Sequence, residues 1–171
     1  MSRTRAGLLD GAARAFAEHG LRGSTMQSVA AEAGVAKGTL YNYFRTKDDV
    51  ARALLAAEAD RLAAVAAALP LDQALTLLAD ELGTHPVLRR LAESEPDLLA
   101  GLLLPDAGRW AELTASLARV LAVDDDAAEL AGRWLLGVVL QPGRTTQRRR
   151  QAAALAAALR PAGLTPGADR G

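Results

Sequence analysis

The stretch from Thr25 to Lys47, TMQSVAAEAGVAKGTLYNYFRTK, constrains the fold of this chain more than any other. It contains two short apolar patterns with helical spacing, which Gly34 separates. Glycine adopts a left-handed backbone conformation easily, so Gly34 predicts a tight turn, with Val35 filling the corner between two helices. The residues expected to face inward are Met26, Val29, Ala30 and Ala33 in the first helix and Leu40 and Phe44 in the second.

The second of these helices, predicted over 37–44, has an exposed side of polar and aromatic residues. They are Lys37, Gly38, Thr39, Tyr41, Asn42 and Tyr43. Most of these side chains can bond to nucleic acid, and a helix-turn-helix offers such a helix to the major groove with its N-terminal residues nearest the base edges. The stretch therefore predicts a helix-turn-helix.

Two further helices are predicted to flank this motif. An apolar stripe over 3–19 predicts a helix that Gly20 ends. Thr46 and Asp49 form a capping box that begins a helix over 47–69, with an apolar series from Val50 through Arg61 and Val65 to Leu69. At about 1.5 Å per residue this helix spans about 33 Å, enough to link a small domain to a separate one. Thr25 is expected to cap the motif's first helix, with Ser28 too short to complete a capping box.

Beyond Pro70 the sequence predicts a bundle of six or so amphipathic helices. Their expected ranges are 71–82, 87–93, 98–104, 106–123, 124–140 and 144–160. The fold class is thus all-α, with an N-terminal three-helix helix-turn-helix domain over 1–50, a linker helix over 47–69 and a C-terminal helical domain over 70–160. The Pro- and Gly-containing residues 161–171 are expected to be a disordered tail.

Charge is distributed unevenly along the chain. Seven basic and three acidic residues precede Asp48, a net charge of +4, so the remainder carries −4 in a chain of zero net charge. This asymmetry is expected if only the N-terminal end meets phosphates. The N-terminus lacks an unbroken apolar run, which argues against a signal peptide or a membrane span, and the chain has no cysteine; a soluble cytoplasmic protein is expected.

An enzyme is not supported by the residues. His19 and His85 lie far apart in the sequence, and the sequence contains neither a Gly-rich phosphate loop nor a paired-carboxylate motif. We therefore expect no catalytic residues, no metal site and no cofactor.

The segment TMQSVAAEAGVAKGTLYNYFRTKDDV, preceded by AFAEHG, resembles the DNA-binding domain of the TetR family of transcriptional repressors. The Ala-Gly-Val turn, the Gly-Thr-Leu-Tyr run, the Tyr-Phe pair and the Thr-Lys helix start all fall at the family's spacing. The resemblance covers about the first 50 residues. It implies a repressor that binds double-stranded operator DNA and is released by a ligand bound in the C-terminal domain.

Residue roles follow from the resemblance. It implies that Thr25, the amide of Met26 and Lys47 touch phosphates, and that Tyr41 and Tyr43 bond phosphates or pack on sugars. The residues implied to lie against base edges are Lys37, Gly38, Thr39 and Asn42.

Some positions depart from the family's pattern or allow a second interpretation. Ala36 replaces a frequent Ser or Thr, which removes one capping and phosphate-binding hydroxyl, and Ser28 replaces an acidic residue. Tyr41 could also belong partly to the core.

A homodimer is expected, because one short recognition helix binds too few bases whereas a two-fold dimer reads a palindrome. The last two helices are predicted to be antiparallel, and a pair from each subunit would form a four-helix interface. Small residues on these helices permit close approach, although ordinary packing within one subunit explains them equally well. They are Ala127, Ala128, Ala131, Gly132, Gly137, Ala153 and Ala157.

A pocket for a small apolar or amphipathic ligand is expected in the C-terminal domain, although its tryptophans are also ordinary core residues. Residues suited to line it are Leu102, Leu103, Trp110, Leu113, Trp134 and Val138, with Glu93, Arg109 and Arg133 as polar partners. Bound ligand would favour a spacing of the two DNA-binding domains that misses successive major grooves. A regulator without small-molecule sensing and an activator remain alternatives.

A cluster of arginines begins the last helix, where cations oppose the helix dipole. Either a solvated surface or a pairing with the acidic turn at 124–126 would explain it. The cluster consists of Arg144, Arg148, Arg149 and Arg150.

Overall fold

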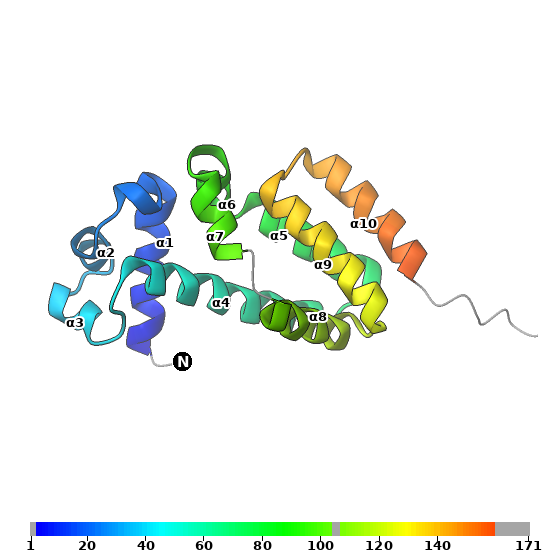
Figure 1. The fold of residues 1–171 in the computed structure, drawn as a ribbon, viewed down its shortest axis with the longest axis horizontal. Helices are drawn as coiled ribbons and strands as arrows, with labels where there is room; N and C mark the ends of the chain where they lie inside the picture. Colours follow the sequence, from blue (N-terminus) through cyan, green and yellow to red (C-terminus); the bar gives the residue numbers. More distant parts are fainter. Residues whose placement is uncertain (1–2, 104–106, 160–171) are drawn as a thin grey trace, which may run out of the picture.

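The computed structural model describes residues 3–103 and 107–159, and within these ranges the chain forms ten α-helices and no strand. The helices are α1 (Arg3–Gly23), α2 (Met26–Glu32), α3 (Lys37–Tyr41), α4 (Lys47–Ala66), α5 (Leu71–Thr84), α6 (Pro86–Ser94), α7 (Pro96–Leu103), α8 (Ala107–Leu121), α9 (Asp125–Leu140) and α10 (Thr145–Leu159). The predicted all-α fold is confirmed (Figure 1).

Helices α1–α3 form a head at one end of the elongated molecule, and α5–α10 form a body (Figure 1). Helix α4 begins directly after the head, packs on it with its first half and continues along the body (Figure 1). We use "head" for residues 3–46 and "body" for residues 71–159.

Helix α1 is the central helix of the head. It buries Leu8, Ala12 and Phe16 on one face, in the predicted spacing. Gly20 has the positive φ that the sequence predicts (73°), but the helix resumes for a last turn to Gly23. The helical backbone is therefore interrupted at Gly20, as predicted, and one further turn to Gly23 follows the kink.

Helix α2 begins with a complete capping box. The Ser28 amide donates to the Thr25 hydroxyl (3.0 Å), and the Thr25 amide donates to the Ser28 hydroxyl (2.9 Å). The expectation that Ser28 is too short for this return bond is wrong. The serine hydroxyl also donates to the Thr25 carbonyl, which holds it close to the cap.

Helix α3 follows a turn at Gly34, which has a φ of 67° as predicted. The helix ends at Tyr41, earlier than the predicted range of 37–44, but Leu40 and Phe44 are both buried under it. Ala36 occupies the N-cap and makes no side-chain cap, as the sequence indicates.

Helix α4 begins at the predicted capping box, in which the Asp49 amide donates to the Thr46 hydroxyl and the Thr46 amide to the Asp49 carboxylate. Its buried face differs from the predicted series. Arg61 and Val65 are exposed, and Leu62 is buried in their place. The helix packs first on the head and then on the body, so one stripe of constant spacing does not describe it.

Two apolar cores lie along the molecule. The first contains the head and the start of α4, and it extends into α6, α7 and α9 through Leu88, Leu91, Leu99 and Val139. The second joins the distal half of α4 to α5, α9 and α10. Helices α6 and α7 thus pack with the head, and the predicted domain ranges stay predictions.

A buried arginine fixes the turn between α9 and α10. The guanidinium of Arg148 donates to the carbonyls of Pro142 (2.7 Å) and Gly143 (3.2 Å), and it lies 3.7 Å from Asp80 on α5. Arg149 also pairs with Asp80 (2.7 Å). A pairing of this cluster with residues 124–126, one of its two predicted explanations, is wrong for these two arginines, because α10 packs along α5.

The small residues of the last two helices fall into two groups. Ala127, Ala128, Ala131 and Gly132 are buried within this chain, whereas Gly137, Ala153 and Ala157 are exposed. Packing inside one subunit therefore explains the first group. The predicted tail at 161–171 and the end of the predicted helix over 98–104 lie outside the described residues. Within the described residues, no helix is both long and apolar enough to cross a membrane.

Candidate functional site

The outer surface of the head is formed by α3 and the turn after it. Leu40 and Phe44 anchor this segment in the first core, and the side chains between and before them point outward. Tyr41 and Tyr43 are 46% and 45% exposed, which is unusual for large aromatic residues. Six of the predicted DNA-contacting residues therefore share one surface, on which only Thr39 is half-buried. They are Lys37, Gly38, Thr39, Tyr41, Asn42 and Tyr43.

Two details of this surface bear on the binding of another molecule. The Lys37 ammonium lies 5.6 Å from the centroid of the Tyr41 ring, so a cation and an aromatic face are held together. A Cβ added to Gly38 would meet no atom within 4 Å. The packing of the described chain therefore does not require a glycine at 38, whereas close approach of a second molecule would.

The remaining predicted DNA contacts lie at the starts of α2 and α4. Thr25 is exposed and caps α2, and Met26 is half-buried behind it. The ammonium of Lys47 donates to three backbone carbonyls at the end of α1, those of Leu21 (2.8 Å), Arg22 (3.4 Å) and Ser24 (3.3 Å). Lys47 thus has a structural role that sequence reasoning missed.

The end of α1 is held from the opposite side by a buried carboxylate of the body. Glu95, between α6 and α7, accepts hydrogen bonds from the amides of Leu21 (3.0 Å) and Arg22 (3.1 Å). A Cβ at Gly20 would lie 2.2 Å from its Oε1 atom, so a side chain there would have to displace this carboxylate. Glu95 therefore ties the kink of α1 to the body.

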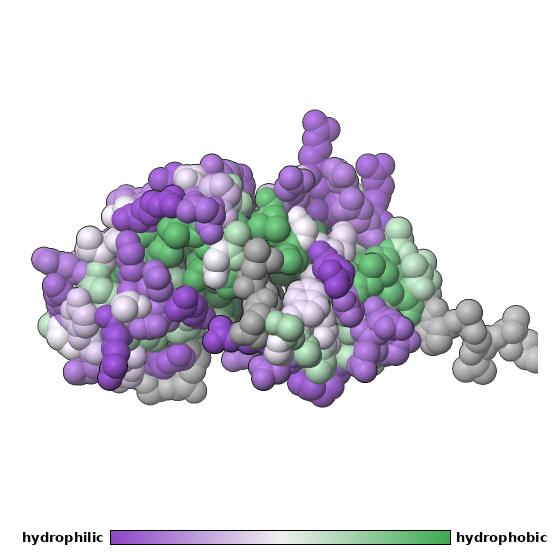
Figure 2. Space-filling view, in the orientation of Figure 1, coloured by the Kyte–Doolittle hydropathy of each residue, from purple (hydrophilic) through white to green (hydrophobic). Residues whose placement is uncertain are grey.

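A cavity of about 250 Å³ lies in the body beside α4. Helices α4, α5, α6, α7, α8 and α9 all contribute to its wall, and its lining residues come from both apolar cores. Figure 2 shows apolar surface gathered where the two halves of the molecule meet, whereas the visible surface of the head is mostly hydrophilic. The cavity thus lies in the body, next to the region where the two apolar cores meet.

Three of the predicted pocket residues line this cavity, namely Leu103, Trp110 and Leu113. The other three do not: Leu102 packs against the first core, and Trp134 and Val138 belong to the second. Of the predicted polar partners, Arg133 lies over the outside of the wall, 5.6 Å from the Trp110 ring centroid, and Glu93 and Arg109 are exposed.

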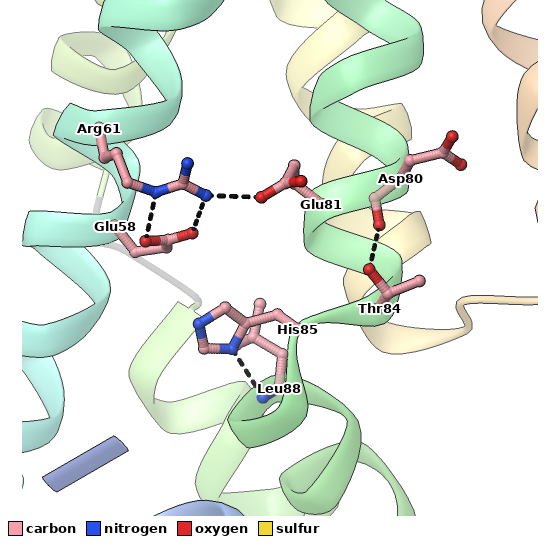
Figure 3. A network of polar contacts seen from close by, with 7 residues as sticks. All are labelled: Glu58, Arg61, Asp80, Glu81, Thr84, His85 and Leu88. Carbon is pink, nitrogen blue, oxygen red and sulfur yellow. Dashed lines mark hydrogen bonds and ion pairs between the residues drawn. The ribbon is translucent and has the colours of Figure 1, made fainter. Parts of the chain in front are cut away.

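A polar network joins α4 to α5 next to the cavity (Figure 3). Arg61 donates to both oxygens of Glu58, one turn away on α4 (2.9 and 2.6 Å), and to Glu81 on α5 (2.5 Å). His85 follows α5 and caps α6, because its Nδ1 accepts from the Leu88 amide (3.4 Å). Glu58 also lines the cavity.

The network fixes the charge states of two groups. Hydrogen bonding from Arg61 lowers the pKa of Glu58, so this carboxylate is ionised at neutral pH. Burial lowers the pKa of His85, so its imidazole is neutral there, as an acceptor at Nδ1 requires.

Sequence reasoning missed the α4 side of the cavity. This wall consists of residues at helical spacing, namely Leu55, Glu58, Ala59, Leu62 and Ala63. A carboxylate inside an apolar stripe was the signal available in the sequence. In the described residues, no group of three or more His, Cys, Asp or Glu side chains could hold a metal ion.

Comparison with known proteins shows which family this arrangement resembles. Residues 8–54, from α1 into α4, match the model of the bacterial regulatory proteins of the tetR family. In this segment the chain is similar to the TetR family. The match spans the head and the start of α4, and so contains every TetR-type contact residue considered above.

Curated TetR-type relatives are described as repressors. The chain is 33% identical over 117 residues to the HTH-type transcriptional repressor Rv1474c of Mycobacterium tuberculosis. It is 36% identical over 67 residues to the repressor AcnR of Corynebacterium diphtheriae. These matches cover 65% and 39% of this chain but 58% and 35% of the relatives, so the chain spans less than two thirds of their length.

Solved structures extend the TetR fold to the body. The TetR family repressor AlkX from Dietzia sp. strain DQ12-45-1b superposes with a TM-score of 0.66 at 21% identity, covering 91% of this chain and 94% of AlkX. FadR from Bacillus subtilis, in complex with stearoyl-CoA, superposes with a TM-score of 0.57 at 18% identity, covering 90% and 96%. At these identities the likeness establishes the fold.

Proposed function

We propose that this chain is a transcriptional repressor that binds a palindromic DNA operator as a homodimer and leaves it when a small apolar or amphipathic molecule occupies the cavity. We propose that it acts in the cytoplasm, where bacterial DNA lies. The observation that carries the proposal is the outer surface of α3, where polar, basic and aromatic side chains stand exposed over a buried Leu40 and Phe44.

The chemistry of this surface supports contact with DNA. Lysine and tyrosine bond phosphates, and Thr39 and Asn42 can read base edges. Gly38 lets the backbone approach the groove, since nothing within the described chain fills the space beside it. The repressor descriptions of the curated relatives support the direction of regulation.

The outward face of α9 supports dimerisation. Leu130 and Leu140 are 50% and 39% exposed, and Gly137 lies between them on the same face. Residues spaced by seven and three positions form one stripe on a helix, and an exposed apolar stripe is typical of a surface that a second subunit covers.

The position of the cavity supports release by a ligand. Its wall joins α4, which enters the head, to α6 and α7, which pack on the head. A molecule that prefers a different spacing of these helices shifts the population of head positions. An unfilled volume also favours a sensing regulator over one without a ligand, and FadR, whose structure holds stearoyl-CoA, gives a precedent within the fold.

Selection of bound duplexes from a random DNA library tests the proposal. We expect a palindromic sequence with half-sites about one helical turn apart, roughly 10 base pairs. Thr39→Ala should select a motif altered within the half-site, whereas Arg119→Ala, which removes an exposed charge on α8, should select the wild-type motif. Enrichment of no sequence would contradict the proposal.

A further inference from the structure

The charge of the cavity wall restricts what the cavity can hold. Eighteen described residues line it, and apart from the Trp110 indole the polar side chains among them are those of Glu58 and Ser116. Glu58 is the ionisable one of the two. An occupant therefore meets an apolar wall with a single carboxylate.

The surroundings of Glu58 leave this negative charge in excess. Arg61 neutralises one carboxylate but is shared between Glu58 and Glu81. His85, the remaining titratable member of the network on this side, is neutral because burial lowers its pKa. Two carboxylates and one guanidinium give the network a net charge of −1.

No cation among the described lining residues offsets this charge. Arg61 is held by three bonds to carboxylate oxygens and does not line the cavity. Arg133 stacks over Trp110, but its side chain is exposed and pairs with Glu129 on α9. An anionic occupant would lie beside Glu58 without a counter-charge from these residues.

Resting on the proposed sensing function, we propose that the cavity binds a hydrophobic cation, an apolar molecule with a protonated amine that pairs with Glu58. A charge enters an apolar site at low cost only when it is paired, and Glu58 supplies the partner. A cavity of 150 Å³ holds benzene, so about 250 Å³ suits a molecule of roughly ten heavy atoms.

The same pairing connects the ligand to the head. An ammonium at Glu58 competes with Arg61, which links α4 to Glu81 on α5. Occupancy therefore weakens the α4–α5 ion pair next to the cavity. Helix α4 carries this change to the head, because its N-terminal half belongs to the first core.

Three probes with the same eight-carbon chain test the proposal: octylammonium, 1-octanol and octanoate. Binding to the full chain at pH 7 is measured by calorimetry and by tryptophan fluorescence, since Trp110 lines the cavity. We expect octylammonium to bind about tenfold more tightly than octanol, the size of one charge-assisted hydrogen bond, and octanoate to bind most weakly.

Variants assign this preference to Glu58. Glu58→Gln should reduce the preference for octylammonium over octanol from about tenfold to about twofold or less, and Glu58→Asp should retain most of it. Glu112→Gln, which removes an exposed carboxylate of α8 outside the lining, should leave all three affinities unchanged. Thermal melts establish that each variant is folded.

Two results would overturn the proposed cation binding but not the proposed sensing function. They are octanoate binding as tightly as octylammonium, and an amine preference that survives Glu58→Gln. In either case, release of the selected operator by any of the probes keeps the sensing function. If none of the three probes binds or releases the operator, both the inference and sensing through this cavity fail.

Discussion

Lys47 has a structural role in the head in addition to its predicted contact with phosphate. Its ammonium donates hydrogen bonds to carbonyls at the end of α1, including that of Leu21, which lies 26 positions earlier in the sequence. Its phosphate contact remains a prediction, and the same side chain now also stabilises the head.

Replacing Lys47 separates these two roles. Lys47→Ala should lower the free energy of unfolding by roughly 1–3 kcal/mol, because the carbonyls of Leu21 and Ser24 lose a charged donor. It should also reduce the salt slope of DNA affinity by about one unit if the ammonium reaches a phosphate. Urea titrations measure the first effect and binding isotherms at several salt concentrations the second. Arg45→Ala, at an exposed position, is the control for stability, and an unchanged midpoint in Lys47→Ala would refute the structural role.

His85 predicts how stability depends on pH. Its pKa is lowered in the folded state, so the unfolded chain binds the proton more readily, and stability falls as pH drops through the unfolded value of about 6.5. Protonation also removes the acceptor that caps α6. His85→Asn keeps a capping acceptor without titrating, so its unfolding free energy should vary less between pH 7 and 5.

The chain offers a matched control for this comparison, because its other histidine, His19, is exposed. His19→Asn should retain the wild-type dependence on pH, as measured by denaturant unfolding at each pH. A loss of the dependence in His19→Asn and not in His85→Asn would show that the assignment is wrong.

The residues of α3 were predictable because their roles depend on local spacing. The exposed residues at 37–43 lie beside two buried residues, Leu40 and Phe44, whose apolar spacing is visible in the sequence. The turn at Gly34 sets where the helix begins. Glu58 is a carboxylate inside an apolar stripe, but its partners, like those of Glu95, were not predictable in this way. Their surroundings come from α5, α6 and α1, and local periodicity carries no information about such packing.

At the scale of elements, the contact between the α1 kink and the α6–α7 junction is the main link between head and body besides α4. Gly20 and Glu95 meet there at a distance at which a side chain at 20 would have to displace the Glu95 carboxylate. The amides of the last α1 turn depend on the same carboxylate. Substitutions at these two positions should therefore be coupled.

A double-mutant cycle measures this coupling. Gly20→Ala should destabilise the protein for two reasons, its positive φ, at about 1–2 kcal/mol, and the clash with Glu95. Glu95→Ala should cost roughly 1–3 kcal/mol, because buried amides lose their acceptor. In the Glu95→Ala background, Gly20→Ala should cost less than alone, since only the backbone strain remains. Additive effects in urea unfolding would contradict the contact.

Element existence was predicted well and element ends less well. Capping residues marked the starts of α2 and α4, since a hydroxyl cap is a local feature. The last turn of α1, beyond Gly20, was not predicted, because contacts from Lys47 and Glu95, far away in the sequence, hold it.

At the scale of the whole molecule, the stripe on α9 predicts where two subunits meet. Leu130→Glu with Leu140→Glu should convert a dimer to a monomer, because two charges would be buried without partners. Val65→Glu, at another exposed apolar position on α4, should remain a dimer. Size-exclusion chromatography with light scattering distinguishes the two masses, and a wild-type monomer at micromolar concentration would contradict the dimer itself.

The fold of the molecule followed from its sequence, but the arrangement of its cores did not. Helix α6 packs on α1 although the two are separated by more than 60 residues, and α6 also contributes Leu88 to the cavity wall. No sequence motif predicts the contact between α1 and α6, because it forms between apolar helix faces, and most helices of the chain have such a face.

The affinity ratio between the selected operator and a scrambled duplex of equal length tests the central claim most directly. Fluorescence anisotropy at fixed salt should give a ratio of about 10³ or more for the wild type. The double variant Lys37→Ala/Thr39→Ala, which leaves the buried anchors of α3 intact, should lose most of that ratio. An equal affinity of the wild type for both duplexes, or a ratio unchanged in the variant, would contradict recognition of an operator by α3.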